Sequence, residues 1–153
     1  MTIEHLLSLD DINDDIEKAL FIALQAHSEQ RDKSGEMYIL HVMRVAVKMH
    51  TNQGRIVALL HDVVEDTNVT IEDIQNIFDE EIANAIYAIT HKPNEPNALY
   101  IKRVKANPLA TAVKIQDLRD NMSWQRMAML PSADVERLLK KYTKAYAALQ
   151  GVY

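Results

Sequence analysis

Cysteine is absent from this sequence of 153 residues. Neither a disulfide framework nor a thiolate zinc site is available, so any bound metal must be held by imidazole and carboxylate groups. No apolar run approaches the roughly 20 residues that a membrane-spanning helix needs, and residues 1–10 lack the basic region and long apolar run of a secretion signal. We therefore expect a cytoplasmic protein without a membrane partner.

Positive charge is also scarce. Lysine and arginine number 17 against 22 aspartates and glutamates, which gives a formal charge of −5. Extended binding to DNA or RNA depends on many cationic side chains that neutralise phosphates, so we expect no nucleic-acid partner. A small phosphorylated ligand needs only a local cluster of cations. Such clusters occur at Arg31 with Lys33 and at Lys102, Arg103 and Lys105, although ordinary surface charge is the alternative explanation for both.

Breakers of regular structure are few: three glycines and four prolines, with no sustained alternation of apolar and polar residues. We therefore predict an all-α protein of helices joined by short loops. With 48% apolar residues, residues 1–153 are expected to fold as a single domain. Helices are predicted to begin at the capping residues Thr70, Asn107 and Ser132. An apolar stripe at helical spacing predicts a core face: Ile82, Ala85, Ile86 and Ile89. The longest irregular stretches are expected at residues 29–37 and 91–97.

The segment RIVALLHDVVED, residues 55–66, carries the strongest chemical signal. On a helix that turns about 100° per residue, His61, Asp62, Glu65 and Asp66 share one face and the apolar residues take the other. A solvated outer face would normally mix charges of both signs, whereas no lysine or arginine balances these three carboxylates. Because packed carboxylates repel one another, a bound divalent cation is the preferred explanation.

Two further segments supply candidate ligands. His41 begins an apolar helical stripe, where a hydrogen-bonded core histidine is the alternative. Asp117 lies in a largely apolar segment, where an unpaired carboxylate would be costly to bury. Two neutral imidazoles and two carboxylates give a ligand set that suits Mn²⁺, which we prefer, or Fe²⁺ or Zn²⁺. The predicted ligands of one metal ion per chain are His41, His61, Asp62 and Asp117.

The three segments AHSEQRDKSGEMYILH, ALLHDVVEDTNVTIEDI and AVKIQDLRDNM, in this order, closely resemble the HD hydrolase domain of RelA/SpoT-like proteins and the stand-alone small alarmone hydrolases. The resemblance covers about residues 27–121 and continues into the final helix. It implies an all-α HD-domain fold and one Mn²⁺ on the four ligands. It also implies hydrolysis of the 3′-pyrophosphate of guanosine tetra- or pentaphosphate (ppGpp or pppGpp), which yields GDP or GTP and pyrophosphate.

The resemblance also implies roles for individual residues. Glu65 and Asp66 match an acidic pair that assists the attacking water. The resemblance leaves open which of the two acts as the base. The residues that match the surroundings of the nucleotide are Lys33, Ser34, Tyr38 and Asn121. Asp32 departs from the long enzymes, which carry an arginine there that helps to hold the guanine base. Since a carboxylate accepts hydrogen bonds from guanine N1 and N2 or from an adenine amino group, we expect Asp32 to affect base choice.

Two alternatives stay open at this point. One is an HD phosphohydrolase of another nucleotide, such as a 5′-nucleotidase, an adenine alarmone hydrolase or an NADPH phosphatase. The other is a non-catalytic module that senses nucleotides. The complete set of four ligands with Glu65 and Asp66 favours an enzyme, because a degenerate copy is expected to have lost at least one of them.

Overall fold

The structure is a computed structural model that describes residues 9–151, so the expectation about a secretion signal falls mostly on residues outside the described ones. In this range the only paired extended backbone is an isolated antiparallel bridge between Arg31 and Met37, and every regular element is a helix, which confirms the all-α prediction. None of these helices is both long and apolar enough to cross a membrane. The elements, in order, are η2 (Leu9–Asp11), α1 (Asp15–Ala26), α2 (Tyr38–Val47), α3 (Asn52–Leu60), α4 (Val63–Asp66), α5 (Ile71–Ile77), α6 (Glu80–Ile89), α7 (Asn97–Lys105), α8 (Pro108–Asn121), α9 (Trp124–Met127) and α10 (Ser132–Gln150).

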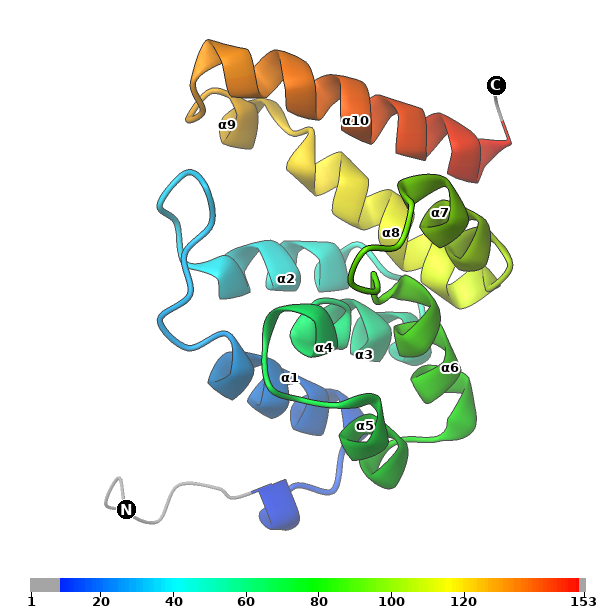
Figure 1. Ribbon diagram of the computed structural model, residues 1–153. Helices are drawn as coiled ribbons and strands as arrows, with labels where there is room; N and C mark the ends of the chain where they lie inside the picture. Colours follow the sequence, from blue (N-terminus) through cyan, green and yellow to red (C-terminus); the bar gives the residue numbers. More distant parts are fainter. Residues whose placement is uncertain (1–8, 152–153) are drawn as a thin grey trace.

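Helix α8 lies at the centre of the arrangement. It packs against α2 and α3 on one side, against α10 on the other, and also against α6 and α7 (Figure 1). Helix α3 in turn packs against α1, α2 and α6. Side chains on α2, α3 and α8 can therefore meet although they lie far apart in the sequence.

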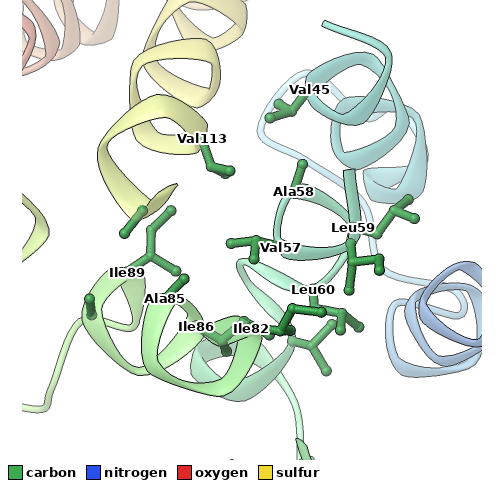
Figure 2. Packing of buried hydrophobic residues seen from close by; sticks show 14 of the residues in the cluster. Val45, Val57, Ala58, Leu59, Leu60, Ile82, Ala85, Ile86, Ile89 and Val113 are labelled. Carbon is green, nitrogen blue, oxygen red and sulfur yellow. The ribbon is translucent and has the colours of Figure 1, made fainter. Parts of the chain in front are cut away.

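The core forms where α3 meets α6. Figure 2 shows Val57 and Leu60 of α3 among side chains of α6, with Val45 of α2 and Val113 of α8 beside them. Full burial of one such aliphatic side chain contributes about 1.5–3 kcal/mol. The stripe predicted for α6 is confirmed, because all its members are buried: Ile82, Ala85, Ile86 and Ile89. This buried cluster lies next to the end of α3, which two of the candidate ligands directly follow.

Two of the three predicted helix caps are confirmed. Thr70 forms a reciprocal capping box with Asp73, and the Asn107 side chain accepts a hydrogen bond from the Ala110 amide. The prediction for Ser132 is wrong by one position, because Ser132 is the first helical residue and Pro131 is the N-cap. Pro131 has extended backbone (ψ 143°), and no side chain caps this helix.

The prediction of one continuous helix over residues 55–66 is also wrong. Helix α3 ends at Leu60, and the short helix α4 begins at Val63. The His61 side chain explains the interruption, because its Nδ1 lies 2.6 Å from the carbonyl oxygen of Ala58. In an unbroken α-helix that carbonyl would accept the amide hydrogen of Asp62. The break leaves His61 and Asp62 at a junction between two helices.

The predicted irregular stretch between α1 and α2 is a tight loop built around Asp32. The Asp32 Oδ1 atom accepts hydrogen bonds from the Ser34 amide (2.9 Å), the Ser34 hydroxyl (2.6 Å) and the Glu36 amide (3.0 Å). Gly35 has a φ of 85°, a backbone conformation that glycine adopts without strain. The Tyr38 amide donates to the Gln30 carbonyl, which closes the loop at the start of α2. The loop is therefore held in one shape beside the N-terminus of α2.

Candidate functional site

Four of the predicted site residues converge at the junction of α2, α3 and α8. Each offers one ligand atom, and these atoms all lie within 4.8 Å of one another. His41 comes from α2, His61 and Asp62 from the junction between α3 and α4, and Asp117 from α8. All are buried except Asp62, which is half-buried. The structure thus brings the four proposed metal ligands together from separate segments.

The two imidazoles are held so that their Nε2 atoms face the carboxylates. His41 Nε2 lies 2.9 Å from Asp117 Oδ1, and His61 Nε2 lies 2.9 Å from Asp62 Oδ2. On the opposite side of each ring, Nδ1 faces an oxygen acceptor, Asp120 Oδ2 for His41 and the Ala58 carbonyl for His61. For His61, a proton on Nδ1 satisfies the contact and leaves the Nε2 lone pair for a metal, as is usual for metal-binding histidines. For His41 the same tautomer suits Asp120, whereas Arg126 Nη1, a donor 2.9 Å from the same Nδ1, requires a lone pair there.

The donor set fits a divalent ion. His61 is 1% exposed, and although its Nε2 lies 2.9 Å from Asp62 Oδ2, the angles of that contact do not make a hydrogen bond, so this buried polar atom is unsatisfied among the described residues. An unsatisfied buried polar atom is unfavourable, and coordination removes the penalty. Imidazole and carboxylate ligands suit Mn²⁺, Fe²⁺ and Zn²⁺.

Electrostatics among the four residues are strong. Burial opposes protonation of the two histidines, but the neighbouring carboxylates raise the pKa of His41 and of His61. Burial likewise opposes ionisation of Asp117, yet Lys114 and the two imidazoles lower the pKa of that carboxyl well below its usual range. The negative charge of the carboxylates can be balanced either by protons on the imidazoles or by a metal ion. A metal ion that binds here is therefore expected to displace protons.

Three residues that contact the candidate ligands or their partners were not predicted from the sequence. Lys114 Nζ lies 2.8 Å from Asp117 Oδ2, so one carboxylate is balanced by a lysine of its own helix. Asp120 accepts from His41 Nδ1 at 2.6 Å and from Arg44 Nε at 2.9 Å. Lys114 and Asp120 lie three positions on either side of Asp117, a helical spacing that was a usable signal. Arg44 reaches the site through a contact between helices, which sequence spacing does not reveal.

Glu65 and Asp66 lie on α4, at the open rim of the four-residue cluster. Both side chains are exposed, but the surrounding protein displaces part of their hydration. This desolvation, followed by the charges of Asp62 and Asp66, raises the pKa of Glu65 to about 7. Desolvation and the charge of Asp62 also raise the pKa of Asp66. A carboxyl group that titrates near neutral pH is suited to proton transfer.

The four residues predicted to surround a nucleotide line one cavity of about 270 Å³: Lys33, Ser34, Tyr38 and Asn121. Two of them also contact the cluster. The Tyr38 hydroxyl donates to Asp62, and Asn121 Nδ2 donates to Asp117 Oδ1 at 3.1 Å. The cavity therefore adjoins the candidate metal centre.

Asp32 also lines this cavity, but its carboxylate is engaged within the protein. Its side chain is 2% exposed, and its Oδ2 lies 3.2 Å from the Arg126 guanidinium of α9. Because Oδ1 already accepts three hydrogen bonds from the loop, the carboxylate is not free to bind a base. The expectation that Asp32 directly affects base choice is corrected on this point. Arg126, which was not predicted from the sequence, places a guanidinium group at this wall of the cavity.

A second cavity of about 120 Å³ is lined by residues of α7, α8 and α10, together with Glu65 and His91. Lys114 and Lys141 give it positive charge, and Glu65 forms part of its wall. Tyr142 lines both cavities. The smaller cavity thus carries two lysines, and one of them, Lys114, also contacts the candidate ligand Asp117.

Comparison with known proteins identifies the family and the fold of the chain. The sequence pattern of the HD domain matches residues 19–134, most of the chain. The chain belongs to the HD-domain family. A solved structure described as "A metazoan ortholog of SpoT hydrolyzes ppGpp and plays a role in starvation responses" superposes with a TM-score of 0.74 at 21% identity, covering 90% of this chain and 86% of that one. At this identity the superposition shows the fold alone, and it confirms the predicted HD-domain architecture.

Two sequence relatives are much longer than this HD-domain chain. A guanosine-3′,5′-bis(diphosphate) 3′-pyrophosphohydrolase from Aquifex aeolicus (strain VF5) is 30% identical over 148 residues, which is 89% of this chain but 21% of that protein. An enzyme of the same name from Borreliella burgdorferi is 47% identical over 77 residues, 48% of this chain and 12% of that protein. The chain therefore spans about a fifth or less of the length of these relatives.

Proposed function

We propose that this chain is a nucleotide phosphohydrolase that uses one divalent metal ion, with Mn²⁺ as that ion. We further propose that it hydrolyses the 3′-pyrophosphate of ppGpp or pppGpp to GDP or GTP and pyrophosphate. The observation that carries the proposal is the convergence of His41, His61, Asp62 and Asp117 beside a cavity lined by the predicted nucleotide-binding residues. The names of the two long relatives support the choice of substrate.

The metal would be held by the two Nε2 atoms and by one oxygen each of Asp62 and Asp117. When bound, such an ion lowers the pKa of water and offsets charge on phosphoryl oxygens. Lys114 keeps the second oxygen of Asp117 occupied, which orients the carboxylate toward the imidazoles. Asp120 likewise orients the His41 ring through its contact with Nδ1.

In the proposed reaction a water oxygen attacks the phosphorus that is bonded to O3′, and the bond between O3′ and phosphorus breaks. We assign Glu65 as the base that accepts the proton of this water, because desolvation and the charge of Asp62 raise its pKa to about 7, which suits proton transfer near neutral pH. Asp66 supports the water from the same helix. The departing O3′ gains a proton, so the products are a nucleoside 5′-diphosphate or 5′-triphosphate and pyrophosphate.

The two cavities suit the two ends of such a substrate. The larger cavity offers the aromatic rings of Tyr38 and Tyr142 and the apolar side chains of Leu130 and Leu138, which suit a nucleoside. The smaller cavity has Lys114 and Lys141, which suit phosphate groups. We propose that the scissile bond lies between them, over the metal centre.

The test is a release assay for phosphate and pyrophosphate with purified, Mn²⁺-loaded protein. The panel contains ppGpp, the adenine counterpart ppApp, NADPH and nucleoside 5′-monophosphates. Pyrophosphate release from ppGpp is expected. If a different compound of the panel is cleaved and ppGpp is not, the guanosine substrate is wrong but the assignment as a phosphohydrolase stands. No cleavage of any member, together with tight binding of one, favours the nucleotide-sensing module.

A further inference from the structure

Arg126 is a partly buried arginine of the short helix α9 that the proposed reaction does not use. Its side chain is 16% exposed, and its guanidinium group meets acceptors from two separate segments. Nη2 lies 3.2 Å from Oδ2 of Asp32, in the loop before α2. Nη1 donates to Oδ1 of Asn121 at 2.5 Å and lies 3.3 Å from Oδ2 of Asp120, and both acceptors belong to α8. One side chain thus joins the loop to the helix that carries Asp117.

On the side of the metal centre, Arg126 reaches two candidate ligands. Asn121 accepts from Arg126 through Oδ1 and donates through Nδ2 to Oδ1 of Asp117 at 3.1 Å. Because a guanidinium group only donates and an ionised carboxylate only accepts, these contacts fix the orientation of the Asn121 amide. Nη1 of Arg126 also lies 2.9 Å from Nδ1 of His41. The guanidinium group therefore contacts His41 directly and Asp117 through Asn121.

On the side of the larger cavity, Arg126 holds the loop through Asp32. Oδ1 of this carboxylate accepts from Ser34 and Glu36 of the loop, whereas Oδ2 faces the guanidinium group. The Asp32 side chain is 2% exposed, so the ion pair is largely shielded from water. Removal of one partner from such a pair leaves an uncompensated charge, which is costly. The ion pair therefore ties the loop, with its cavity residues Lys33 and Ser34, to α9.

We propose that Arg126 is a positioning residue that couples the loop before α2 to the metal centre, so that a divalent ion and a nucleotide bind cooperatively. The inference rests on the proposed function for the role of the loop. An ion that fixes Asp117 restricts Asn121 and Arg126. Arg126 in turn restricts Asp32 and the loop, and a nucleotide that contacts the loop orders the same residues from the other end. Two ligands that order the same residues favour each other's binding, and the effect is reciprocal.

Amide hydrogen exchange, followed by NMR, tests the link without any nucleotide. The diamagnetic ion Zn²⁺ is the probe, and rates with and without it are compared within each chain. In the unaltered chain Zn²⁺ should slow exchange of the Ser34 and Glu36 amides, which donate to Asp32, about fivefold or more. In Arg126→Met this response should fall below about twofold while exchange in α2 and α8 still slows. Arg119→Met, which removes an exposed arginine of α8, is the matched control and should respond as the unaltered chain does.

Two further variants separate the ion pair from the fold and from charge alone. Asp32→Asn keeps an oxygen for the loop amides but turns an NH₂ group toward Arg126, so it breaks the link and leaves the arginine in place. Arg126→Lys keeps the charge, but its compact ammonium group does not span the acceptors of Asp32 and Asn121. Both variants should lose the response of the loop to Zn²⁺, with metal content and thermal unfolding measured alongside. A full response in any of the three variants overturns the proposal, and Asp32→Asn decides the outcome if Arg126→Met loses the ion or the fold.

Binding of nucleosides tests the cooperativity directly. Guanosine and adenosine carry no phosphate, so coupling by contact between a phosphate and the ion is excluded. Zn²⁺ should tighten the binding of at least one of them about fivefold or more in the unaltered chain and less than about twofold in Arg126→Met, as measured by titration calorimetry. Equal tightening in both chains, or none in the unaltered chain, overturns the proposal. If the nucleotide panel shows no cleavage while Arg126→Met abolishes the coupling, the hydrolase function fails and the link between loop and ion stands.

Discussion

Nδ1 of His41 lies 2.6 Å from Oδ2 of Asp120, so α8 orients this imidazole from the side opposite to its candidate metal-binding atom. Loss of such a partner typically costs 10–100-fold in metal affinity. Asp120→Asn should therefore weaken Mn²⁺ or Zn²⁺ binding by about 10–100-fold, measured by competition with a chelating dye. Asp15→Asn, at an exposed position of α1, should bind as the unaltered chain does. Equal affinities of the two variants would show that Asp120 does not orient the ligand.

Removal of a ligand tests the metal centre itself. His61→Ala combined with Asp62→Ala should reduce the metal content of carefully loaded protein from about one ion per chain to near zero, because half of the donor atoms are lost. Elemental analysis provides the measurement. His50→Ala removes an exposed histidine outside the cluster and should retain the ion. Unaltered metal content in the double variant would be incompatible with this centre.

Glu65→Gln tests the assigned base. Turnover should fall by roughly 10²-fold or more while metal content stays near one per chain, as for a group that acts on the water. The pH profile gives a second measurement. The pKa of Glu65 is raised to about 7, so the carboxyl is protonated below that pH and kcat/KM should rise as pH increases through this range. A bound cation lowers the pKa, so the acid limb should lie at or below about pH 7.

In the Glu65→Gln variant that acid limb should disappear from the residual activity. An unchanged limb would assign the titration to another group. Loss of the metal together with activity would instead make Glu65 a ligand.

Asp32 is expected to shape the loop and not to read the base. Asp32→Arg removes three hydrogen bonds to Ser34 and Glu36 from a side chain that is 2% exposed. Loss of a buried charged acceptor costs about 1–3 kcal/mol, and KM should increase by roughly 10-fold as the loop loses its shape. Asp32→Asn keeps an acceptor oxygen and should have a smaller effect. A gain of ppGpp cleavage in Asp32→Arg would contradict this view and restore a direct role in base choice.

The cap of α8 offers a test of stability. The Asn107 side chain accepts from the Ala110 amide at 2.9 Å at the start of the helix that carries Asp117. Asn107→Ala should lower the free energy of unfolding by about 1 kcal/mol, measured by chemical denaturation. Asn94→Ala is unsuitable as a control because Asn94 has a positive φ, whereas Asn13→Ala, at an exposed position outside the helices, should leave stability nearly unchanged. An unaffected Asn107→Ala variant would show that Pro108 suffices to start the helix.

The sequence predicted those features whose signal is local. Helical apolar spacing predicted the buried face of α6, and side-chain caps predicted the starts of α5 and α8. The candidate ligands were found because histidine and aspartate have a distinctive chemistry in a segment without balancing cations. The junction between α3 and α4 was not predicted, since it depends on a side chain, His61, competing for a backbone acceptor.

The supporting residues were missed for a different reason. Arg126 meets Asp32 across 94 positions of sequence, and His41 meets Asp120 across 79. Spacing within one helix carries no information on such contacts, because they arise from how helices pack. Asp32 was misjudged on the same grounds: its residue type suggested an acceptor for a base, and only the packed loop reveals that its oxygens are already in use.

The candidate ligands His41 and Asp117 are separated by 76 positions, and the helices that carry them pack side by side. A divalent ion shared by them is a non-covalent cross-link between distant parts of the chain. A ligand that binds only the folded state stabilises it by about 4 kcal/mol when present at 1,000 times its dissociation constant. Amide hydrogen exchange in α2, α3 and α8 should therefore slow together when the ion is added. Depletion of the metal in a cell would then lower the abundance of the protein through degradation as well as its activity, so that supply of the ion would control both.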